Sequence, residues 1–377
     1  MFDEKIINLL VEDAKSVWPM RWDEIEPLFN KCSFSIAVDV IIKHLGLFNK
    51  KGDFETFESM KSKLNIFKDS EYVFQKMIDI LVEEKIIEKK DNGYICLVQD
   101  IDLPGPAECL VEATRKVPEE GAPFQWLSRG YGGLVQFIKG KVYGEEVMFP
   151  FNDFALAEDV YYTSDVYNFW SKLAGKAVKR IIESNYKNKV TVLEIGAGTG
   201  NGTWNVFQYA ENVESKFEKY IFTDISKSLV KKAGKSERFS KYNFIDYKVL
   251  DATKDIEAQG VSEECADIVL AVNVLHATPN LIDGCKAFMK LVKKGGFVVL
   301  GEIAHPENSI YRYMELTFGL LASYYNYQDK ELRPNCPIIR TDTWIKLFKE
   351  VGFSDVIAIP GNKLPGSDRG GVVIAKK

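Results

Sequence analysis

From about residue 188 onward, short β-branched runs alternate with amphipathic segments that have helical periodicity. The runs predicted to be strands are KVTVLEIG, KYIFTDI, FIDYKVLD, ADIVLAVN, GGFVVLGEI, SDVIAIPG and GGVVIAKK. Strands that alternate with helices usually form a mostly parallel sheet with helices on both faces. Residues 188–377 are therefore predicted to form an α/β domain.

Residues 1–100 have a different pattern, with the helical apolar spacing of SIAVDVIIKHLGLF and YVFQKMIDILVEEKII. The second of these is followed by EKKDNGYICL, which predicts a turn at Asn92 and Gly93 and then a short strand. Helices followed by a small hairpin indicate a winged-helix-like module. The net charge of -5 leaves this module without the basic footprint of a DNA reader, so we expect it to serve dimerisation or substrate capping. Nucleic acid is not an expected ligand.

Residues 101–187 begin with the Pro/Gly break DLPGPAE and continue as an aromatic-rich stretch with helical periodicity. A helical connector packed on both neighbours is one interpretation, and a lid over an active site is the other. The predicted organisation is thus a helical N-terminal domain at 1–100, a helical linker and lid at 101–187, and the α/β core at 188–377.

Targeting and metal-binding signals are weak in this chain. The N-terminus MFDEKIINLLVEDAK is acidic and amphipathic, and no window approaches 18 uninterrupted apolar residues, so a cytoplasmic protein without a membrane segment is expected. The six cysteines are widely spaced with no CxxC pair, which favours neither a disulfide framework nor a zinc site. No metal is therefore expected.

A glycine-rich turn follows the first strand of the predicted core, in the string VLEIGAGTG. Gly196, Gly198 and Gly200 let the backbone turn sharply into a helix and approach a ligand closely. Such a pattern is weak on its own, because tight turns between a strand and a helix also occur without a ligand. Its spacing differs from the G-x-G-x-x-G form of dinucleotide binders, and no phosphate-binding lysine follows it.

Acidic residues end successive predicted strands. Glu194 precedes the glycines, Asp224 follows about 30 residues later in YIFTDIS, and Asp251 stands in VLDAT. A carboxylate at the position of Asp224 can accept both hydroxyls of a ribose, and the position of Asp251 is one from which such folds meet an adenine edge. The pattern therefore predicts a nucleoside without phosphates lying across the carboxyl edge of the sheet.

The string LEIGAGTG, which contains Glu194 and the three glycines, is similar to the first motif of class I S-adenosylmethionine-dependent methyltransferases. The resemblance puts Glu194 in the acidic position and makes Asp224 the ribose-binding carboxylate. Further strings resemble the methyltransferase domains of polyketide synthases, above all ADIVLAVNVLHATPNL, GGFVVLGEI, YQDKELRPNCP and TWIKLFKEVGF. This resemblance covers residues 145–377. It implies a Rossmann-like core with a mostly parallel seven-stranded sheet.

The family resemblance also implies a reaction, namely methyl transfer from S-adenosylmethionine, which leaves as S-adenosylhomocysteine. The acceptor in that family is an acyl chain held as a thioester on an acyl carrier protein. A histidine and a glutamate form a base dyad there, and they match His276 in NVLHATP and Glu302 in VVLGEI. The residues support the match, since both follow predicted neighbouring strands at their carboxyl ends. An imidazole oriented by a carboxylate can accept a proton near neutral pH.

Other residues are weaker candidates. Asn273 is predicted either to orient a substrate carbonyl or the amino acid part of the cofactor, or simply to form a turn. Tyr161 is a candidate for capping the site, with core packing as the alternative, and Tyr324 and Tyr325 stand where the family has larger indoles. His44 lies in an amphipathic stretch and is expected to be structural, whereas His305, just after Glu302, is a candidate pocket residue.

The sequence favours methylation of the α-carbon of a β-ketoacyl thioester over methylation of a β-hydroxyl by the same dyad. Two further alternatives stay open. An O-methyltransferase of free small molecules would also carry an N-terminal winged-helix dimerisation module, and a non-catalytic sensor of S-adenosylmethionine would keep the glycine loop without needing a dyad. Monomer and homodimer are both compatible with the sequence, as are a free-standing enzyme and an excised domain.

Overall fold

The computed structural model describes residues 2–19, 21–210, 215–304, 311–364 and 366–377. It divides into two compact units that each combine segments distant in the sequence. Unit 1 comprises residues 1–19, 167–310 and 327–377, and unit 2 comprises residues 20–166 and 311–326. This division differs from the three consecutive segments expected from the sequence.

Unit 1 is built on a seven-stranded sheet with the order β6-β5-β4-β7-β8-β10-β9. Neighbouring strands are parallel except around β10, which runs antiparallel to β8 and β9. The strands are β4 Val190–Ile195, β5 Phe217–Asp224, β6 Ile245–Val249, β7 Ala266–Val272, β8 Val292–Ile303, β9 Asp355–Ile359 and β10 Gly370–Lys376. Every predicted strand run is present, and the mostly parallel sheet is confirmed.

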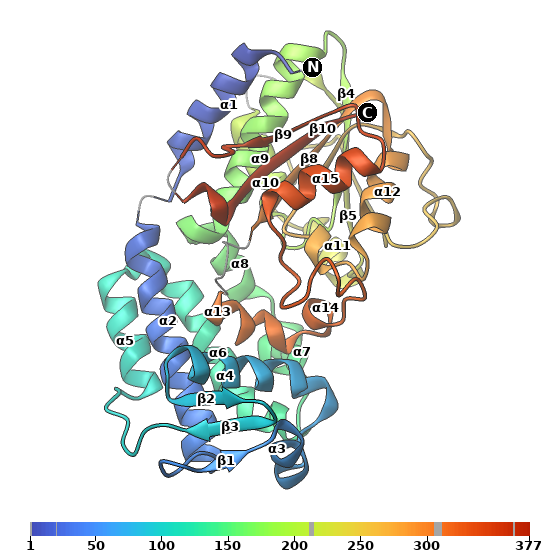
Figure 1. The fold of residues 1–377 in the computed structure, drawn as a ribbon. Coiled ribbons are helices and arrows are strands. Elements are labelled where there is room, and N and C mark those ends of the chain that lie inside the picture. Colours follow the sequence, from blue (N-terminus) through green and yellow to red (C-terminus); the bar gives the residue numbers. More distant parts are fainter. Residues whose placement is uncertain (1, 20, 211–214, 305–310, 365) are drawn as a thin grey trace. The chain divides into compact units, whose positions relative to one another are not determined.

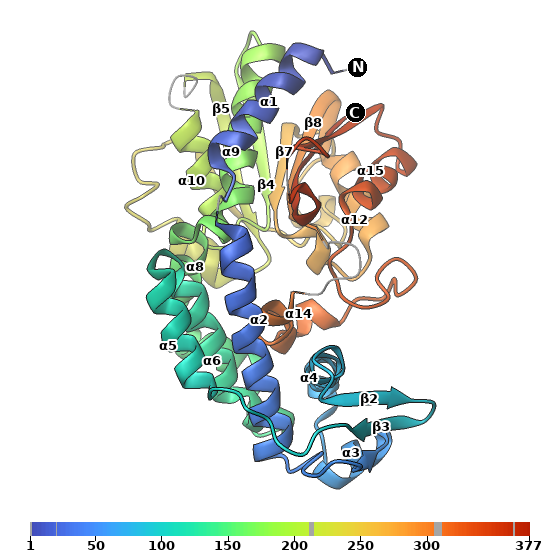
Figure 2. The same ribbon diagram turned by 60° about the vertical axis from the view of Figure 1, so that its left-hand side comes forward.

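Helices cover both faces of this sheet (Figure 2). The helices of unit 1 are α1 Glu4–Val17, α9 Asp165–Asn185, which begins at the end of unit 2, α10 Asn201–Tyr209, α11 Lys227–Ala233, α12 Leu281–Leu291 and α15 Thr341–Glu350. On one face, Phe288 of α12 and Trp344 of α15 join the apolar side chains of β4, β7 and β8 in one buried cluster. Helices α9 and α10 lie on the other face.

Helix α1, drawn in dark blue in Figure 1, packs within unit 1 although it is far from the core in sequence. Asp13 on α1 is buried, and its carboxylate accepts from Nε and Nη2 of Arg180 on α9 at 2.7 and 3.1 Å. The Trp18 ring meets the Phe169 ring edge-on with centroids 4.9 Å apart. A bidentate ion pair and an aromatic contact therefore attach helix α1 and Trp18 to the core.

Unit 2 is mainly helical and carries a small antiparallel sheet of order β1-β3-β2. Its elements are α2 Trp22–Val38, β1 Phe54–Glu55, α3 Phe57–Leu64, α4 Glu71–Glu83, β2 Ile87–Lys90, β3 Gly93–Cys96, α5 Pro106–Lys116, α6 Gly121–Ile138, α7 Gly144–Met148, α8 Ala155–Thr163, α13 Arg312–Glu315 and α14 Ala322–Tyr325. The predicted helices and hairpin are present. The turn lies one residue earlier than predicted, because Gly93 opens β3 and pairs with Lys90.

Close backbone approach explains two features of unit 2. A Cβ at Gly93 would lie 2.6 Å from the carbonyl oxygen of Glu55, so glycine lets β1 pair there. A Cβ at Gly130 would lie 2.7 Å from the carbonyl oxygen of Leu316, and one at Gly144 would lie 1.8 Å from that of Leu320. These glycines let the 311–326 segment pack among helices of the first half of the chain, a packing that local sequence patterns do not predict.

Candidate active site

The glycine turn between β4 and α10 takes the backbone conformation that glycine favours. Gly196, Gly198 and Gly200 have φ values of 62°, 57° and 85°. A Cβ at Gly196 would lie 2.6 Å from the Val274 side chain, and one at Gly200 would lie 2.8 Å from the Phe239 ring. At Gly198 the nearest such atom is 3.8 Å away. The middle of the turn is therefore the part that a ligand can approach most closely.

Asp224, at the end of β5, binds the glycine turn directly. Its Oδ2 accepts from the backbone N–H of Gly198 at 2.9 Å, and its Oδ1 accepts from that of Ser226 at 2.7 Å. Burial raises the pKa of Asp224, and the two N–H groups counteract that effect. Each carboxylate oxygen can accept a second hydrogen bond, and the next residue, Ile225, exposes 67% of its surface. A polar acceptor beside an exposed apolar surface fits the ribose and base of a nucleoside.

The carboxylate of Asp251, which follows β6, binds residues of the turn that comes directly after it. Its Oδ1 accepts from the hydroxyl and the N–H of Thr253 at 2.6 and 3.0 Å, and Lys254 lies 3.1 Å from Oδ2. Burial raises its pKa, but the Thr253 and Lys254 contacts outweigh burial and lower it overall. The side-chain amide of Gln259 accepts from the N–H of Asp251 at 2.9 Å and donates to the carbonyl oxygen of Asp251 at 3.0 Å. The predicted role at an adenine edge stays a prediction.

Glu194 precedes the glycine turn, and its carboxylate is almost wholly buried within the protein. Its Oε2 accepts from the Tyr220 hydroxyl at 2.6 Å and from the Thr203 hydroxyl on α10. A Cβ at Gly202 would lie 2.2 Å from Oε1. Burial raises the pKa of Glu194 to about 7. The contacts observed tie β4 to α10 beneath the glycine turn, and direct cofactor binding by this carboxylate stays a prediction.

The raised pKa of Glu194 predicts a pH-dependent stability. Folding raises the pKa of the Glu194 carboxyl from 4.5 to about 7. The contribution of this carboxyl to the free energy of unfolding is therefore fully present below about pH 4.5 and is lost as the pH rises through about 7. We expect the Glu194→Gln variant to show no such loss of stability, because its amide cannot ionise. Between about pH 5 and about pH 8 the melting temperature of the wild type should therefore fall relative to that of the variant. Thermal unfolding across that range checks it.

The matched control for this prediction is Glu218→Gln, at an exposed position of β5. Its melting temperature should follow the wild type at every pH. Parallel curves for the wild type and Glu194→Gln would contradict the prediction.

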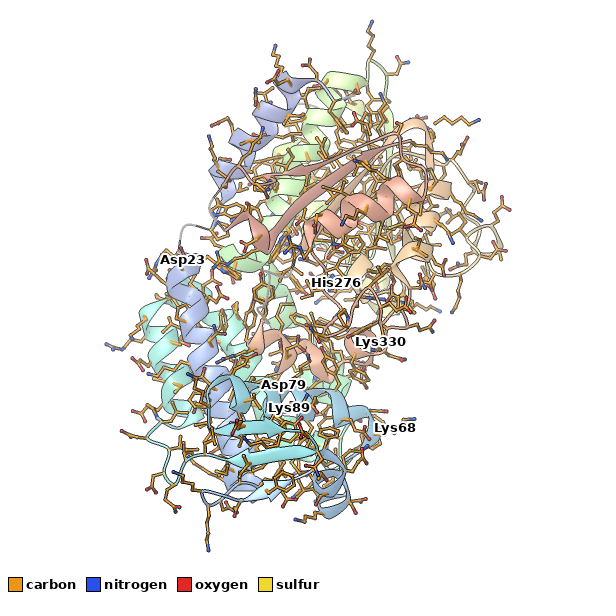
Figure 3. All side chains as sticks on the ribbon, in the orientation of Figure 1. Asp23, Lys68, Asp79, Lys89, His276 and Lys330 are labelled. Atoms are coloured by element: carbon orange, nitrogen blue, oxygen red, sulfur yellow. The ribbon has the colours of Figure 1, made fainter. Side chains whose placement is uncertain are left out.

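His276 and Glu302 meet at the carboxyl edge of the sheet, as predicted from the order of their strands. Strands β7 and β8 are parallel neighbours, His276 lies in the 3₁₀ turn Leu275–Ala277 after β7, and Glu302 stands near the end of β8. The Nδ1 of His276 lies 2.6 Å from Oε2 of Glu302, and both residues are buried. Figure 3 labels His276 in this position.

The second oxygen of Glu302 binds the backbone of the turn that carries the histidine. Its Oε1 accepts from the N–H groups of Val274, Leu275 and His276 at 3.1, 2.8 and 3.4 Å. One carboxylate therefore fixes both the ring and the main chain of His276. With Oε2 as acceptor, the hydrogen-bond network assigns the ring proton to Nδ1 and leaves Nε2 as the basic nitrogen.

Asn273, at the end of β7, has a positive φ of 52° and forms part of the turn. Its side-chain Oδ1 accepts from the N–H of Ile303 at 2.9 Å, and its own N–H donates to the carbonyl of Gly301 at 2.8 Å. These bonds link the ends of β7 and β8 next to the dyad. The structure thus gives Asn273 a turn-forming part, and contact with substrate or cofactor stays a prediction.

A buried amide cluster behind the glycine turn was not predicted from the sequence. The Nδ2 of Asn201 on α10 donates to Asn168 Oδ1 and Ser171 Oγ on α9, at 3.1 and 2.9 Å. The Nδ2 of Asn205 donates to the same Asn168 oxygen at 2.9 Å. The cluster holds the first turn of α10, which begins at Asn201. Its sequence signal is the pair of polar residues four apart on one helical face.

The three candidate pocket tyrosines belong to unit 2 and are described within it. The Tyr324 hydroxyl donates to the buried Glu315 carboxylate at 3.1 Å, and the Tyr72 hydroxyl donates to its other oxygen at 2.6 Å. The Tyr325 ring stacks on the Tyr72 ring, with centroids 5.9 Å apart. Tyr161 lies on α8, where burial raises its pKa to about 12. Their roles toward a substrate stay predictions.

Of the other two histidines, His44 lies among the described residues and His305 does not. The Nε2 of His44 lies 3.1 Å from the Asp39 carboxylate on the surface of unit 2, and Asp39 also accepts from the Tyr131 hydroxyl at 2.7 Å. His44 is thus a half-exposed residue beside a largely buried carboxylate. His305 lies outside the described residues.

Two further findings concern the part of the chain that the structure describes. Within it, no three or more His, Cys, Asp or Glu side chains are grouped so that they could hold a metal ion. None of the helices in that part combines the length and the apolar character needed to cross a membrane. All six cysteines are free thiols.

Known proteins resemble this chain in sequence. A family model described as a methyltransferase domain matches residues 193–298, from the end of β4 to β8. The polyketide synthases PksM and PksR of Bacillus subtilis (strain 168) are 29% and 30% identical over 228 and 256 residues, or 59% and 65% of this chain. The chain spans only 5% and 10% of their lengths.

A solved structure covers nearly the whole chain. The CurJ carbon methyltransferase is 25% identical and superposes with a TM-score of 0.88 over 99% of this chain and 97% of its own. The class I fold expected from the glycine motif is thereby confirmed, and so is the resemblance to polyketide synthase methyltransferases. The chain thus contains a region that matches a methyltransferase domain, has the fold of class I methyltransferases, and is similar to polyketide synthases and to the CurJ carbon methyltransferase.

Proposed function

We propose that this methyltransferase methylates the α-carbon of a β-ketoacyl thioester carried by an acyl carrier protein, with His276 as the base. The observation that carries the proposal is the 2.6 Å contact between His276 Nδ1 and Glu302 Oε2 at the carboxyl edge of the sheet. The likeness to the CurJ carbon methyltransferase supports carbon as the acceptor, and the relatives named as polyketide synthases support a thioester on a carrier.

The residues around the glycine turn fit the cofactor. Gly198 lies where the protein leaves the turn open, Asp224 offers carboxylate oxygens for the ribose, and Ile225 offers an exposed apolar surface for the base. When bound, S-adenosylmethionine supplies an electrophilic methyl group that forms a bond to the deprotonated carbon, while its sulfur leaves as the thioether of S-adenosylhomocysteine. The protein then has to supply alignment and a deprotonated nucleophile.

His276 supplies the deprotonation in this scheme. A hydrogen on a carbon between a ketone and a thioester is acidic, because both carbonyls delocalise the resulting charge. The Nε2 of His276 takes that proton and the imidazole becomes an imidazolium. Glu302 stabilises this cation through Oε2, while its contacts with the backbone keep the ring oriented. After product release the proton passes to solvent and the dyad is restored.

Mass spectrometry on defined carrier-bound substrates tests the proposal. The panel pairs a β-ketoacyl thioester with the matching β-hydroxyacyl thioester, each incubated with S-adenosylmethionine. We expect the β-ketoacyl form to gain one methyl group, which fragmentation locates on the α-carbon. Methyl gain only on the β-hydroxyl would overturn the choice of carbon.

The carrier requires a separate comparison. The same β-ketoacyl group is offered on holo carrier protein and on a free pantetheine thioester at equal concentration. A lower KM with the carrier-bound form is expected, because protein contacts then add to the binding of the acyl chain. Equal KM values for both forms would argue against a carrier partner.

A further inference from the structure

Arg333 is a fully buried arginine next to the turn that carries His276. Its Nη1 donates to the carbonyl oxygen of His276 at 2.7 Å, and its Nη2 donates to those of Thr278 and Pro279, each at 3.0 Å. The side chain has 0% exposure. Three carbonyl groups of one turn therefore converge on a single guanidinium, whose N–H donors are held in a rigid plane.

The charge of Arg333 is balanced inside the protein by Asp329, four residues earlier in the sequence. The Nε of Arg333 donates to Asp329 Oδ1 at 2.5 Å, and Nη2 makes a second contact with the same oxygen. The other oxygen, Oδ2, accepts from the N–H of Leu281, the first residue of α12, at 2.9 Å. The ring of Tyr327 covers the guanidinium, with its centroid 4.7 Å from Cζ.

The segment 327–333 thus binds the turn 276–281 through its main chain as well as through side chains. The N–H of Gln328 donates to the carbonyl of Pro279 at 2.8 Å. Figure 3 labels Lys330 on this segment and His276 on the turn. Burying an arginine is costly unless its partners are well placed, and here three carbonyl oxygens and the Asp329 carboxylate are its partners.

His276 is consequently held from two directions. Glu302 binds its N–H and its Nδ1, and Arg333 binds its carbonyl oxygen. We propose that Arg333, paired with Asp329, is a positioning residue that sets the orientation of the His276 imidazole against Glu302. This inference rests on the proposed function for its effect on rate. The orientation itself is a property of the folded protein and can be measured without any methyl transfer.

The test combines binding, kinetics and NMR on Arg333→Met, Arg333→Lys and Asp329→Asn. Because the chain has only three histidines, a sample with ¹⁵N in the histidine rings gives a simple spectrum. The resonance of the proton between Nδ1 and Glu302 is assigned by its loss in His276→Ala. The stoichiometry of S-adenosylhomocysteine binding gives the number of folded cofactor sites, and kcat is expressed per site.

We expect Arg333→Met to shift or broaden that proton resonance and to lower kcat per site by about 10- to 100-fold, the scale of a displaced catalytic group. The affinity per folded site for S-adenosylhomocysteine should change less than about 2-fold, because the glycine turn and Asp224 do not contact Arg333. Arg333→Lys keeps the charge without the planar fork, so it should recover only part of the rate. Asp329→Asn should also shift or broaden this resonance.

The matched control is Arg340→Met, which removes an arginine that is half exposed and paired with Asp342. It should keep the wild-type resonance and kcat. Should Arg333→Met fail to fold, Arg333→Lys decides the question. A folded Arg333 variant with the wild-type resonance and wild-type kcat overturns the inference. The proposed function fails separately, if His276→Ala retains methyl transfer while the resonance still depends on Arg333.

Discussion

Replacing His276 with alanine is expected to lower kcat for methyl transfer by about 10²- to 10⁴-fold, the usual contribution of a general base. The cofactor affinity should stay near that of the wild type, because Asp224 holds the glycine turn through the N–H groups of Gly198 and Ser226 and not through His276. The substitution removes a buried ring whose Nδ1 contacts the Glu302 carboxylate. The loss should therefore appear in kcat rather than in binding.

Glu302→Gln refines this prediction. Oε1 accepts three backbone N–H groups, so the amide oxygen of glutamine is expected to take that position and its NH₂ group to face Nδ1. An amide N–H donor there would favour the tautomer with the proton on Nε2, which cannot accept another. We expect kcat to fall on the order of 10²- to 10⁴-fold while the fold is kept, as for other oriented histidine bases.

Single-turnover methyl transfer to a competent thioester, followed by mass spectrometry, measures both effects. The matched control is His44→Ala, which removes a half-exposed histidine of unit 2 that pairs with Asp39. Its rate should equal that of the wild type. Near wild-type turnover by His276→Ala would refute the assignment of the base.

Replacing Asp224 with alanine is expected to weaken binding of S-adenosylhomocysteine by about 10- to 100-fold. This is the scale of a lost hydrogen bond to a charged group. Two effects contribute. The acceptor proposed for the ribose hydroxyls disappears, and the N–H groups of Gly198 and Ser226 lose the oxygens that hold the glycine turn in place. The glycine turn then has to be ordered at the expense of binding energy.

Isothermal titration calorimetry with S-adenosylhomocysteine checks this, since the product binds without turnover. Asp246→Asn is the control, because Asp246 lies on the neighbouring strand β6 and pairs with Lys219 at 2.9 Å, apart from the glycine turn. Its affinity should match the wild type. An Asp224→Ala variant that binds as tightly as wild type would show that another group holds the ribose.

The seven core strands, the glycine turn and the meeting of His276 with Glu302 were all predictable from local patterns. β-branched runs between amphipathic segments mark strands of a parallel sheet, and the carboxyl ends of parallel strands lie along one edge. Once β7 and β8 are neighbours, residues that follow one and end the other must lie close together. The topology therefore predicts that the two residues are neighbours, and the structure adds the 2.6 Å contact between His276 Nδ1 and Glu302 Oε2.

The environment of each candidate was less predictable. Glu194 stays a predicted cofactor contact, and the pattern did not predict that Tyr220 and Thr203 bind its carboxylate. Asn273 was equally compatible with a ligand contact and a turn, and its Oδ1 binds the backbone of β8. A residue type and its place at a strand end predict the edge of the sheet, whereas the direction of the side chain depends on which neighbours fill the space.

The sequence by itself determined the class of fold, the cofactor turn and the pair of residues proposed as the base, because these follow from patterns within short stretches. The tertiary structure alone decided that α1 packs with the core through Asp13, that residues 311–326 join the N-terminal unit, and that Arg333 binds the turn of His276. Each of these links joins residues more than 50 positions apart. Such contacts are selected by complementary shape and charge in the folded chain, and no local periodicity encodes them.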